Sequence, residues 1–124
     1  MKIPDNLHYT KEHEWIKFDQ GVAIIGITDF AQGELGDIIF VELPAKDTSF
    51  NSGDSVGIIE AVKTVADIYT PLDGTILEIN KNLEEEPELI NKEPYTKGWI
   101  LKLTNFSKDN ANILSSKEYA KIIS

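Results

Sequence analysis

Short runs rich in apolar and β-branched residues alternate with turn sequences such as DQG, NSGD and PLDG over most of the chain. Runs of this composition, bounded by Gly, Pro, Asn and Asp, are typical of β-strands. Short strands at close spacing indicate a sandwich or a barrel. The pattern predicts strands over Glu14–Phe18, Val22–Ile27, Asp37–Leu43, Ser55–Ala61, Val65–Thr70, Thr75–Ile79 and Trp99–Leu103.

Helix signals are fewer and fall between these strands or after them. Ser, Thr and Asn side chains can accept a hydrogen bond from the first turn of a helix, and Glu three residues later completes a capping box. Such signals predict a helix from Thr28 to Leu35 ending at Gly36, one acidic turn from Asn82 with Glu85 before Pro87, and a C-terminal helix from Ser115 with Glu118 to near Ile123. No linker divides the sequence, so we expect one domain over residues 1–124.

Composition and charge narrow the class of protein. Hydrophobic residues make up 41% and charged residues 27% of the chain, as in an ordinary folded domain. The net charge is −9, every cation is lysine, and no basic stripe occurs, which argues against a nucleic-acid partner. No apolar run is long enough to span a bilayer, and the start MKIPDNLHYTKEHEW has no signal-peptide core. We therefore expect a cytoplasmic protein without a membrane partner; the alternative is a mature organelle protein whose leader has been removed.

Residues for independent catalysis are scarce. The chain has no cysteine, so it can form neither a disulfide nor a thiolate metal site, and it has no thiol nucleophile. His8 and His13 are too few for a histidine-rich zinc site, and the acidic run Glu84–Glu86 suits a solvated helix start. No serine lies in a nucleophile elbow. We expect no metal site and no autonomous hydrolase activity.

One hairpin departs from the usual turn chemistry. Its strands face each other across Val62–Thr64, where a tight turn normally has Asn-Gly or Asp-Gly. Val62 and Val65 are apolar where a polar tip is expected, and Glu60 lies three residues before Lys63. A lysine raised on a rigid hairpin is solvated and accessible, so another protein can modify it. The alternative is an ordinary surface lysine on a turn.

The residues around this hairpin resemble a known family. The segment GDSVGIIEAVKTVADIYTPLDGTILEIN resembles the attachment segment of lipoyl domains. YTKEHEWI, GITDFAQGELGDIIFVELP, EEEPELINKEPYTKGWILKL and SSKEYAKII resemble, in that order, the glycine cleavage system H proteins, from about Leu7 to Ile123. Biotin carriers resemble the chain less, because they have methionines beside their lysine. The resemblance implies a mainly β, lipoyl-domain-like hybrid barrel-sandwich with a few short helices and a C-terminal helix.

The resemblance also assigns roles to individual residues. It implies a lipoyl group (lipoate) in amide linkage to Lys63, which would supply the dithiolane that a chain without cysteine lacks. Glu60 is expected to take part in recognition by the modifying enzyme, and Ala61 stands where the family usually has Ser. A cleft for the loaded arm is implied beside the hairpin, with the carboxylates of Glu12, Glu14 and Asp67.

The implied function is that of a carrier, rather than an enzyme, in glycine catabolism and one-carbon metabolism. In this family the protein is a shuttle that takes an aminomethyl group from glycine decarboxylase (P protein) to aminomethyltransferase (T protein) and reducing equivalents to dihydrolipoyl dehydrogenase (L protein). A lipoyl ligase or transferase modifies it, and we expect a monomer. One alternative is a lipoyl donor, or relay protein, for the lipoylation of 2-oxoacid dehydrogenase complexes. Another is a binding module that keeps the fold without lipoylation.

Overall fold

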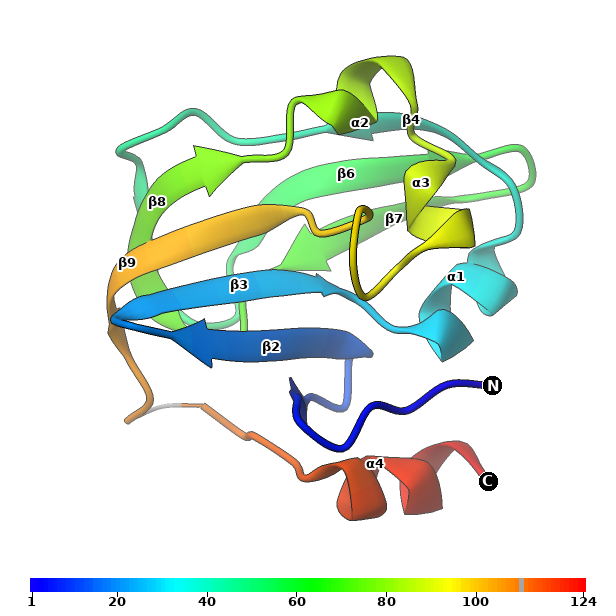
Figure 1. The fold of residues 1–124 in the computed structure, drawn as a ribbon. Helices are drawn as coiled ribbons and strands as arrows, with labels where there is room; N and C mark the ends of the chain where they lie inside the picture. Colours follow the sequence, from blue (N-terminus) through cyan, green and yellow to red (C-terminus); the bar gives the residue numbers. More distant parts are fainter. Residues whose placement is uncertain (110) are drawn as a thin grey trace.

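Two antiparallel sheets form the fold in the computed structural model, which describes residues 1–109 and 111–124 (Figure 1). The larger sheet has the strand order β1-β2-β3-β9-β8-β5, and the smaller sheet has the order β4-β6-β7. The strands are β1 (His8–Tyr9), β2 (Glu14–Asp19), β3 (Val22–Ile27), β4 (Ile38–Glu42), β5 (Ser49–Phe50), β6 (Ser55–Ala61), β7 (Val65–Tyr69), β8 (Asp73–Ile79) and β9 (Leu101–Ser107). The predicted mainly β fold is confirmed.

Each predicted strand is present, with shifted ends in some cases. Strand β9 begins at Leu101 rather than at Trp99, because the Trp99 carbonyl oxygen accepts a hydrogen bond from the Asn80 side-chain amide (2.7 Å). The two-residue strands β1 and β5 were not predicted, since two residues are too short to show an alternation.

The helices confirm two of the three predicted start signals. Helix α1 (Asp29–Leu35) begins after Thr28, whose hydroxyl accepts a hydrogen bond from the Ala31 amide. Its C-cap residue is Gly36, with φ of 79°, a conformation that favours glycine. Helix α4 (Ser116–Ile123) has the complete capping box predicted for it, with reciprocal hydrogen bonds between its N-cap serine and the glutamate three residues later.

The predicted capping box at Asn82 is wrong. Helix α2 (Asn82–Glu85) exists, but Asn82 is its first helical residue and the N-cap position falls on Lys81 without a side-chain hydrogen bond. The Asn80 side chain instead accepts a hydrogen bond from the Asn82 amide (3.2 Å). A second single-turn helix, α3 (Leu89–Lys92), follows Pro87 and was not predicted.

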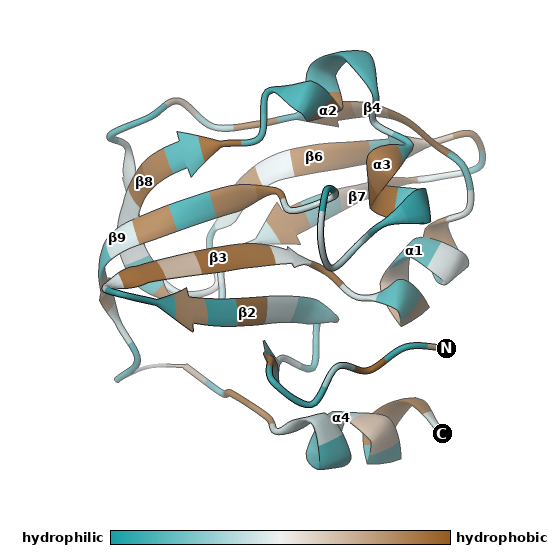
Figure 2. Ribbon diagram, viewed as in Figure 1, coloured by the Kyte–Doolittle hydropathy of each residue, from teal (hydrophilic) through white to brown (hydrophobic). Residues whose placement is uncertain are grey.

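The main core lies between the two sheets and takes apolar side chains from both, and Figure 2 shows apolar segments along β3, β6 and β9. A smaller cluster on the outer side of β2 joins Tyr9, Trp15 and Tyr119, and the rings of Tyr9 and Tyr119 stack at 4.8 Å. Trp15 packs directly over Gly26, where a Cβ would lie 2.6 Å from the indole ring. Buried aromatic rings contribute much of the apolar area that such a cluster removes from water.

Within the described residues, no helix is long and apolar enough to cross a membrane.

Candidate functional site

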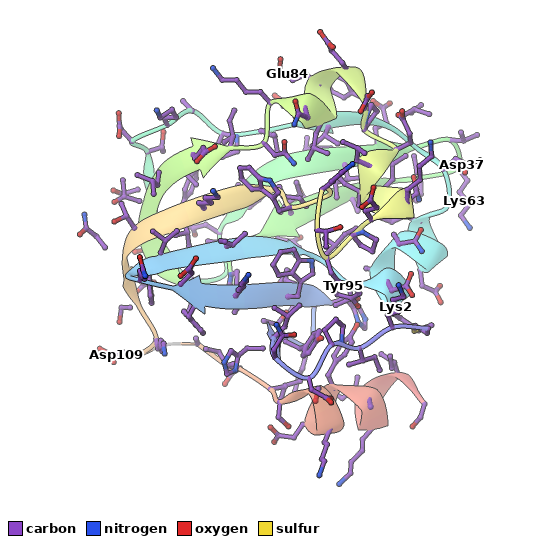
Figure 3. All side chains as sticks on the ribbon, viewed as in Figure 1. Lys2, Asp37, Lys63, Glu84, Tyr95 and Asp109 are labelled. Carbon is purple, nitrogen blue, oxygen red and sulfur yellow. The ribbon has the colours of Figure 1, made fainter. Side chains whose placement is uncertain are left out.

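Lys63 lies at the tip of the hairpin formed by β6 and β7 (Figure 3). The Ala61 N–H donates to the Thr64 carbonyl oxygen across the turn (2.8 Å). None of Val62, Lys63 and Thr64 has a positive φ, so this turn has no need of the Asn-Gly sequence that tight hairpins usually contain. All three residues are exposed, and the lysine is therefore accessible to another protein.

One hydrogen bond joins the hairpin tip to the segment that follows α1, and the Lys63 side chain lies over the same segment. The Val62 N–H donates to the Asp37 carbonyl oxygen (3.0 Å), and Figure 3 shows Asp37 and Lys63 at the same end of the molecule. The Lys63 side chain passes over Gly36, where an added Cβ would lie 3.3 Å from the lysine Cε. Gly36 thus leaves room for the lysine stem as well as ending α1.

Asn91, in α3, holds this segment in place. Its side-chain oxygen accepts from the Ile38 N–H (2.9 Å), and its side-chain amide donates to the Gly36 carbonyl (2.8 Å) and to the Gln32 side chain (3.0 Å). One half-buried side chain therefore determines the path of the backbone on which the hairpin tip rests. Sequence reasoning missed Asn91, because its partners lie more than fifty residues earlier in the chain.

Glu60 lies on the exposed face of the small sheet, three residues before Lys63. Its cross-strand neighbours are Phe40 on β4 and Val65 on β7. Among the described residues, no ion pair within 4.0 Å involves Glu60 or Lys63. Both charges are therefore available to a partner, and the role of Glu60 in modification stays a prediction.

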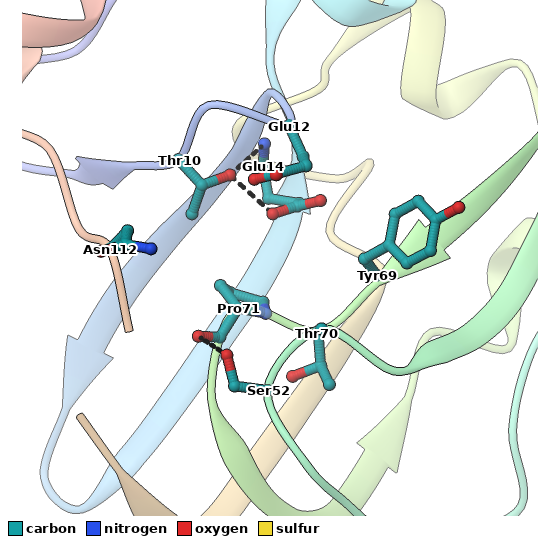
Figure 4. Close-up of a pocket in the computed structure, with 9 residues that line it drawn as sticks. Thr10, Glu12, Glu14, Ser52, Tyr69, Thr70, Pro71 and Asn112 are labelled. Carbon is teal, nitrogen blue, oxygen red and sulfur yellow. Dashed lines mark hydrogen bonds between the residues drawn. The ribbon is translucent and has the colours of Figure 1, made fainter. Parts of the chain in front are cut away.

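A pocket of about 300 Å³ opens beside the start of β2 and the end of β7 (Figure 4). Glu12 and Glu14, two of the three carboxylates expected in the cleft, both line it, and their role there stays a prediction. The pocket is lined by Thr10, Glu12, Glu14, Ser52, Gly53, Tyr69, Thr70, Pro71 and Asn112. Sequence reasoning did not single out Tyr69 or Thr70, which no motif marks as pocket residues.

Glu14 is the buried carboxyl group of this pocket, with an exposed fraction of only 4%. The pKa of Glu14 is raised to about 7, chiefly by burial; a hydrogen bond donated by the Thr10 hydroxyl (2.6 Å) opposes the rise, and the nearby Glu12 carboxylate adds to it. The Thr10 oxygen also accepts from the Glu14 N–H (3.2 Å), which fixes the pair. A carboxyl group in this state can gain or lose a proton near neutral pH, and a cation in the pocket favours the ionised form.

Asp67 does not line this pocket. It is exposed on β7 and accepts hydrogen bonds from the Ser55 hydroxyl (3.0 Å) and the Tyr69 hydroxyl (3.4 Å). Tyr69 lines the pocket and so connects Asp67 with its rim. The structure thus brings Glu12 and Glu14 together and leaves Asp67 on the adjoining face, where its role in the cleft stays a prediction.

The hairpin tip and the pocket lie at opposite ends of β7. At about 3.3 Å per residue, the strand Val65–Tyr69 spans roughly 16 Å. A lysine side chain alone is too short to cover that distance. A group that reaches from Lys63 into the pocket must therefore be attached to the lysine and extend well beyond it.

Comparison with known proteins identifies the family. Residues 7–124 match the family model described as "Glycine cleavage H-protein". A "Glycine cleavage system H protein" of Listeria welshimeri is 56% identical over 122 residues, which make up 98% of this chain and 98% of that protein. The chain belongs to the glycine cleavage H-protein family. A protein of the same description from Staphylococcus epidermidis is 47% identical over 125 residues, covering 99% of this chain and 98% of its own length.

A solved structure supports the same assignment. The crystal structure of a glycine cleavage system H protein from Mycobacterium marinum matches with a TM-score of 0.87 and 34% sequence identity, over 95% of this chain and 96% of that chain. Family and fold predicted from the sequence are therefore confirmed, as is the role of a carrier protein in the glycine cleavage system.

Proposed function

We propose that Lys63 carries lipoate in amide linkage and that the chain uses this arm as the shuttle of the glycine cleavage system. The observation that supports the proposal is the exposed lysine on a hairpin tip that is tied to the Asp37 carbonyl oxygen. Because the tip is held in place, only the lysine–lipoyl arm moves. The tether raises the effective concentration of the lipoyl group at each partner enzyme.

The residues present fit this group. Gly36 leaves the space that a side chain would fill beside the lysine stem, and the ammonium of Lys63 has no ion-pair partner among the described residues. When bound, lipoate supplies a disulfide ring that can accept the aminomethyl group and be reoxidised afterwards, which is chemistry that a chain without cysteine lacks.

The pocket of Glu12 and Glu14 suits the amine end of a loaded arm. A protonated amine near Glu14 would favour the carboxylate form and lower the raised pKa of Glu14, so that Glu14 would release its proton to solvent. The walls of the pocket would limit the access of water to the bound aminomethyl group and so slow the hydrolysis of that group. Asp67 would extend the acidic surface toward the hairpin through its hydrogen bond with Tyr69.

The same arm would serve several partners in turn. We propose glycine decarboxylase, aminomethyltransferase and dihydrolipoyl dehydrogenase as the enzymes that act on it, and a lipoyl ligase or transferase as the enzyme that attaches it. Because all of them must act on one arm in turn, each contact is expected to be small and transient.

Replacement of Lys63 tests the attachment site. Natively expressed wild-type protein should have the intact mass of a chain with one lipoyl group, whereas Lys63→Arg should have the unmodified mass and no glycine–bicarbonate exchange activity. Arginine keeps the charge and much of the length but cannot form the amide. Lys81→Arg, an exposed lysine at the N-cap of α2, is the control. Exchange by Lys63→Arg at the wild-type rate would refute the proposal, provided that both proteins melt alike by circular dichroism.

The acidic pocket is tested on the loaded protein. The lipoylated chain is loaded with the aminomethyl group, the decarboxylase is removed, and the release of ammonia and formaldehyde is followed. We expect faster release from Glu14→Ala and from Asp67→Ala than from the wild type. Three identical decay curves would mean that neither carboxylate holds the loaded arm.

A further inference from the structure

Strand β4 contains a β-bulge close to the hairpin that carries Lys63. Ile38 pairs with Ala61, but the next paired residue on β4 is Phe40, opposite Glu60, so the register shifts between Ile38 and Phe40. A regular strand alternates its side chains between the two faces, and a bulge interrupts this alternation. As a result, Ile39 and Phe40 are consecutive and both exposed, at 54% and 51%.

Two further apolar side chains are exposed beside them. Val62, at the hairpin tip, is 72% exposed, and Val65, the first residue of β7, is 59% exposed. Phe40, Glu60 and Val65 are successive cross-strand partners, so they form one row across the small sheet. We call Ile39, Phe40, Val62 and Val65 the apolar collar, and Lys63 lies next to it at the hairpin tip. An exposed apolar group of this kind beside a reactive site is typical of a surface that contacts a partner.

The charges on the same face are acidic. Glu42 on β4 pairs with Ile58 on β6, which pairs with Asp67 on β7, so these residues form a second row across the sheet, farther from the tip. The two carboxylates and Ile58 line one shallow depression. Together with Glu60 they make the face negative around the collar. A complementary partner therefore has an apolar surface with basic side chains at its rim.

We propose that this face, the apolar collar with the Glu42–Asp67 row, is the docking surface for the enzyme that acylates Lys63. The inference rests on the lipoyl attachment proposed above. An enzyme that acts on the far end of a long arm can bind wherever the arm reaches it. The acylating enzyme has no such freedom, because it must bring the bare Nζ of Lys63 into its own active site and so must contact the tip itself.

The reaction at that interface is an acyl transfer. The ammonium of Lys63 loses one proton, and its Nζ attacks the carbonyl carbon of an activated lipoyl group, such as the mixed anhydride of an acyl adenylate. The new amide bond forms as the bond from that carbon to the phosphate oxygen breaks, adenylate leaves, and Nζ releases a second proton. None of these steps needs a side chain from this protein other than Lys63. The contribution of the collar is therefore binding, which appears in KM.

The test uses the full-length, unlipoylated chain as the substrate of a purified lipoate-attaching enzyme, with product followed by intact mass. We expect the double variant Phe40→Thr, Val65→Thr to raise KM at least about tenfold with kcat changed less than about twofold. Threonine keeps strand propensity at both exposed positions. Leu77→Thr, an exposed apolar residue on β8, is the matched control and should leave both constants unchanged.

The Glu42–Asp67 row gives a second, independent variant. Glu42→Gln, Asp67→Asn should raise KM at low salt, and the difference from wild type should shrink at about 0.5 M salt, where charges are screened over a few ångströms. All variants are then lipoylated to completion and assayed for glycine–bicarbonate exchange. We expect the exchange rates of the apolar double variant to stay within about twofold of wild type.

The outcomes separate the two proposals. An unmodified wild-type chain, or modification elsewhere than Lys63, would refute the attachment site itself. Lipoylation of the wild type at Lys63, with KM unchanged in Phe40→Thr, Val65→Thr, would overturn only the docking surface. Normal lipoylation of Phe40→Thr, Val65→Thr with impaired exchange would also overturn it, because the collar would then contact a downstream enzyme or the arm.

Discussion

Replacement of Glu14 by glutamine should make the protein more stable at alkaline pH. The substitution removes the charge but keeps an oxygen that can accept the hydrogen bond from Thr10 (2.6 Å). Burial raises the pKa of Glu14 from 4.5 to about 7 in the folded protein. That difference, at about 1.4 kcal/mol per pKa unit, corresponds to roughly 3 kcal/mol of unfolding free energy.

The direction of the pH dependence follows from which state holds the proton. Below about pH 4.5 the carboxyl group is protonated in both states and contributes nothing. Between about pH 4.5 and 7 the unfolded chain loses the proton while the folded chain keeps it, so stability falls as pH rises. Above about pH 7 the ionised Glu14 lowers the free energy of unfolding of the wild type by the full amount of roughly 3 kcal/mol, and Glu14→Gln does not have this loss.

Urea unfolding followed by circular dichroism at pH 4, 6 and 8 measures this effect. We expect wild type and Glu14→Gln to have similar free energies of unfolding at pH 4, and the variant to be more stable by up to about 3 kcal/mol at pH 8. Glu42→Gln, an exposed carboxylate on β4, is the control and should differ from wild type by no more than about 0.5 kcal/mol throughout. A difference for Glu14→Gln that is constant with pH, or a less stable variant at pH 8, would refute the reasoning.

Three other substitutions probe the hairpin and its supports. Glu60→Ala should melt within about 1 kcal/mol of wild type, because the side chain is exposed, yet be lipoylated more slowly; an equal modification rate would remove Glu60 from recognition. Asn91→Ala leaves the Ile38 N–H without its partner, so we expect the free energy of unfolding in urea to fall by about 1–3 kcal/mol. We also expect faster amide hydrogen exchange at Val62, and unchanged exchange there would contradict the role of Asn91 in holding the segment on which the hairpin tip rests. Tyr119→Phe removes a buried hydroxyl that is hydrogen-bonded to Thr28 (2.7 Å) and to His13 Nδ1 (2.8 Å). It should cost about 1–3 kcal/mol, whereas a melt equal to wild type would mean that these bonds add nothing.

Local signals in the sequence were reliable where neighbours within a few residues decide the structure. The Thr28 cap, the C-terminal capping box and the β6–β7 hairpin all depend on such neighbours, and the structure has all of them. Asn82 is the exception, because Asn80 two residues earlier accepts the hydrogen bond from the first helical N–H. Lys63 could be singled out from sequence for the same local reason, since an apolar tip beside an acidic residue contradicts ordinary turn chemistry.

Burial of Glu14 could not be predicted in this way. Strand β2 begins with Glu14, Trp15 and Ile16, all three buried, so its start does not show the alternation of a half-exposed strand. Trp15 is covered by the Tyr9–Tyr119 cluster on the outer side, and Ile16 by the core between the sheets. A raised pKa at Glu14 follows from this packing, not from the EHEW sequence itself.

The strands, the hairpin, its lysine and the family could all be predicted from the sequence. The hydrogen bonds of Asn91, the acidic pocket with Tyr69 at its rim, and the bulge that exposes Ile39 and Phe40 together could not. The difference lies in the separation along the chain of the residues involved. Caps, turns and strand propensity arise from residues a few positions apart, whereas register and burial depend on contacts that form only when distant segments pack.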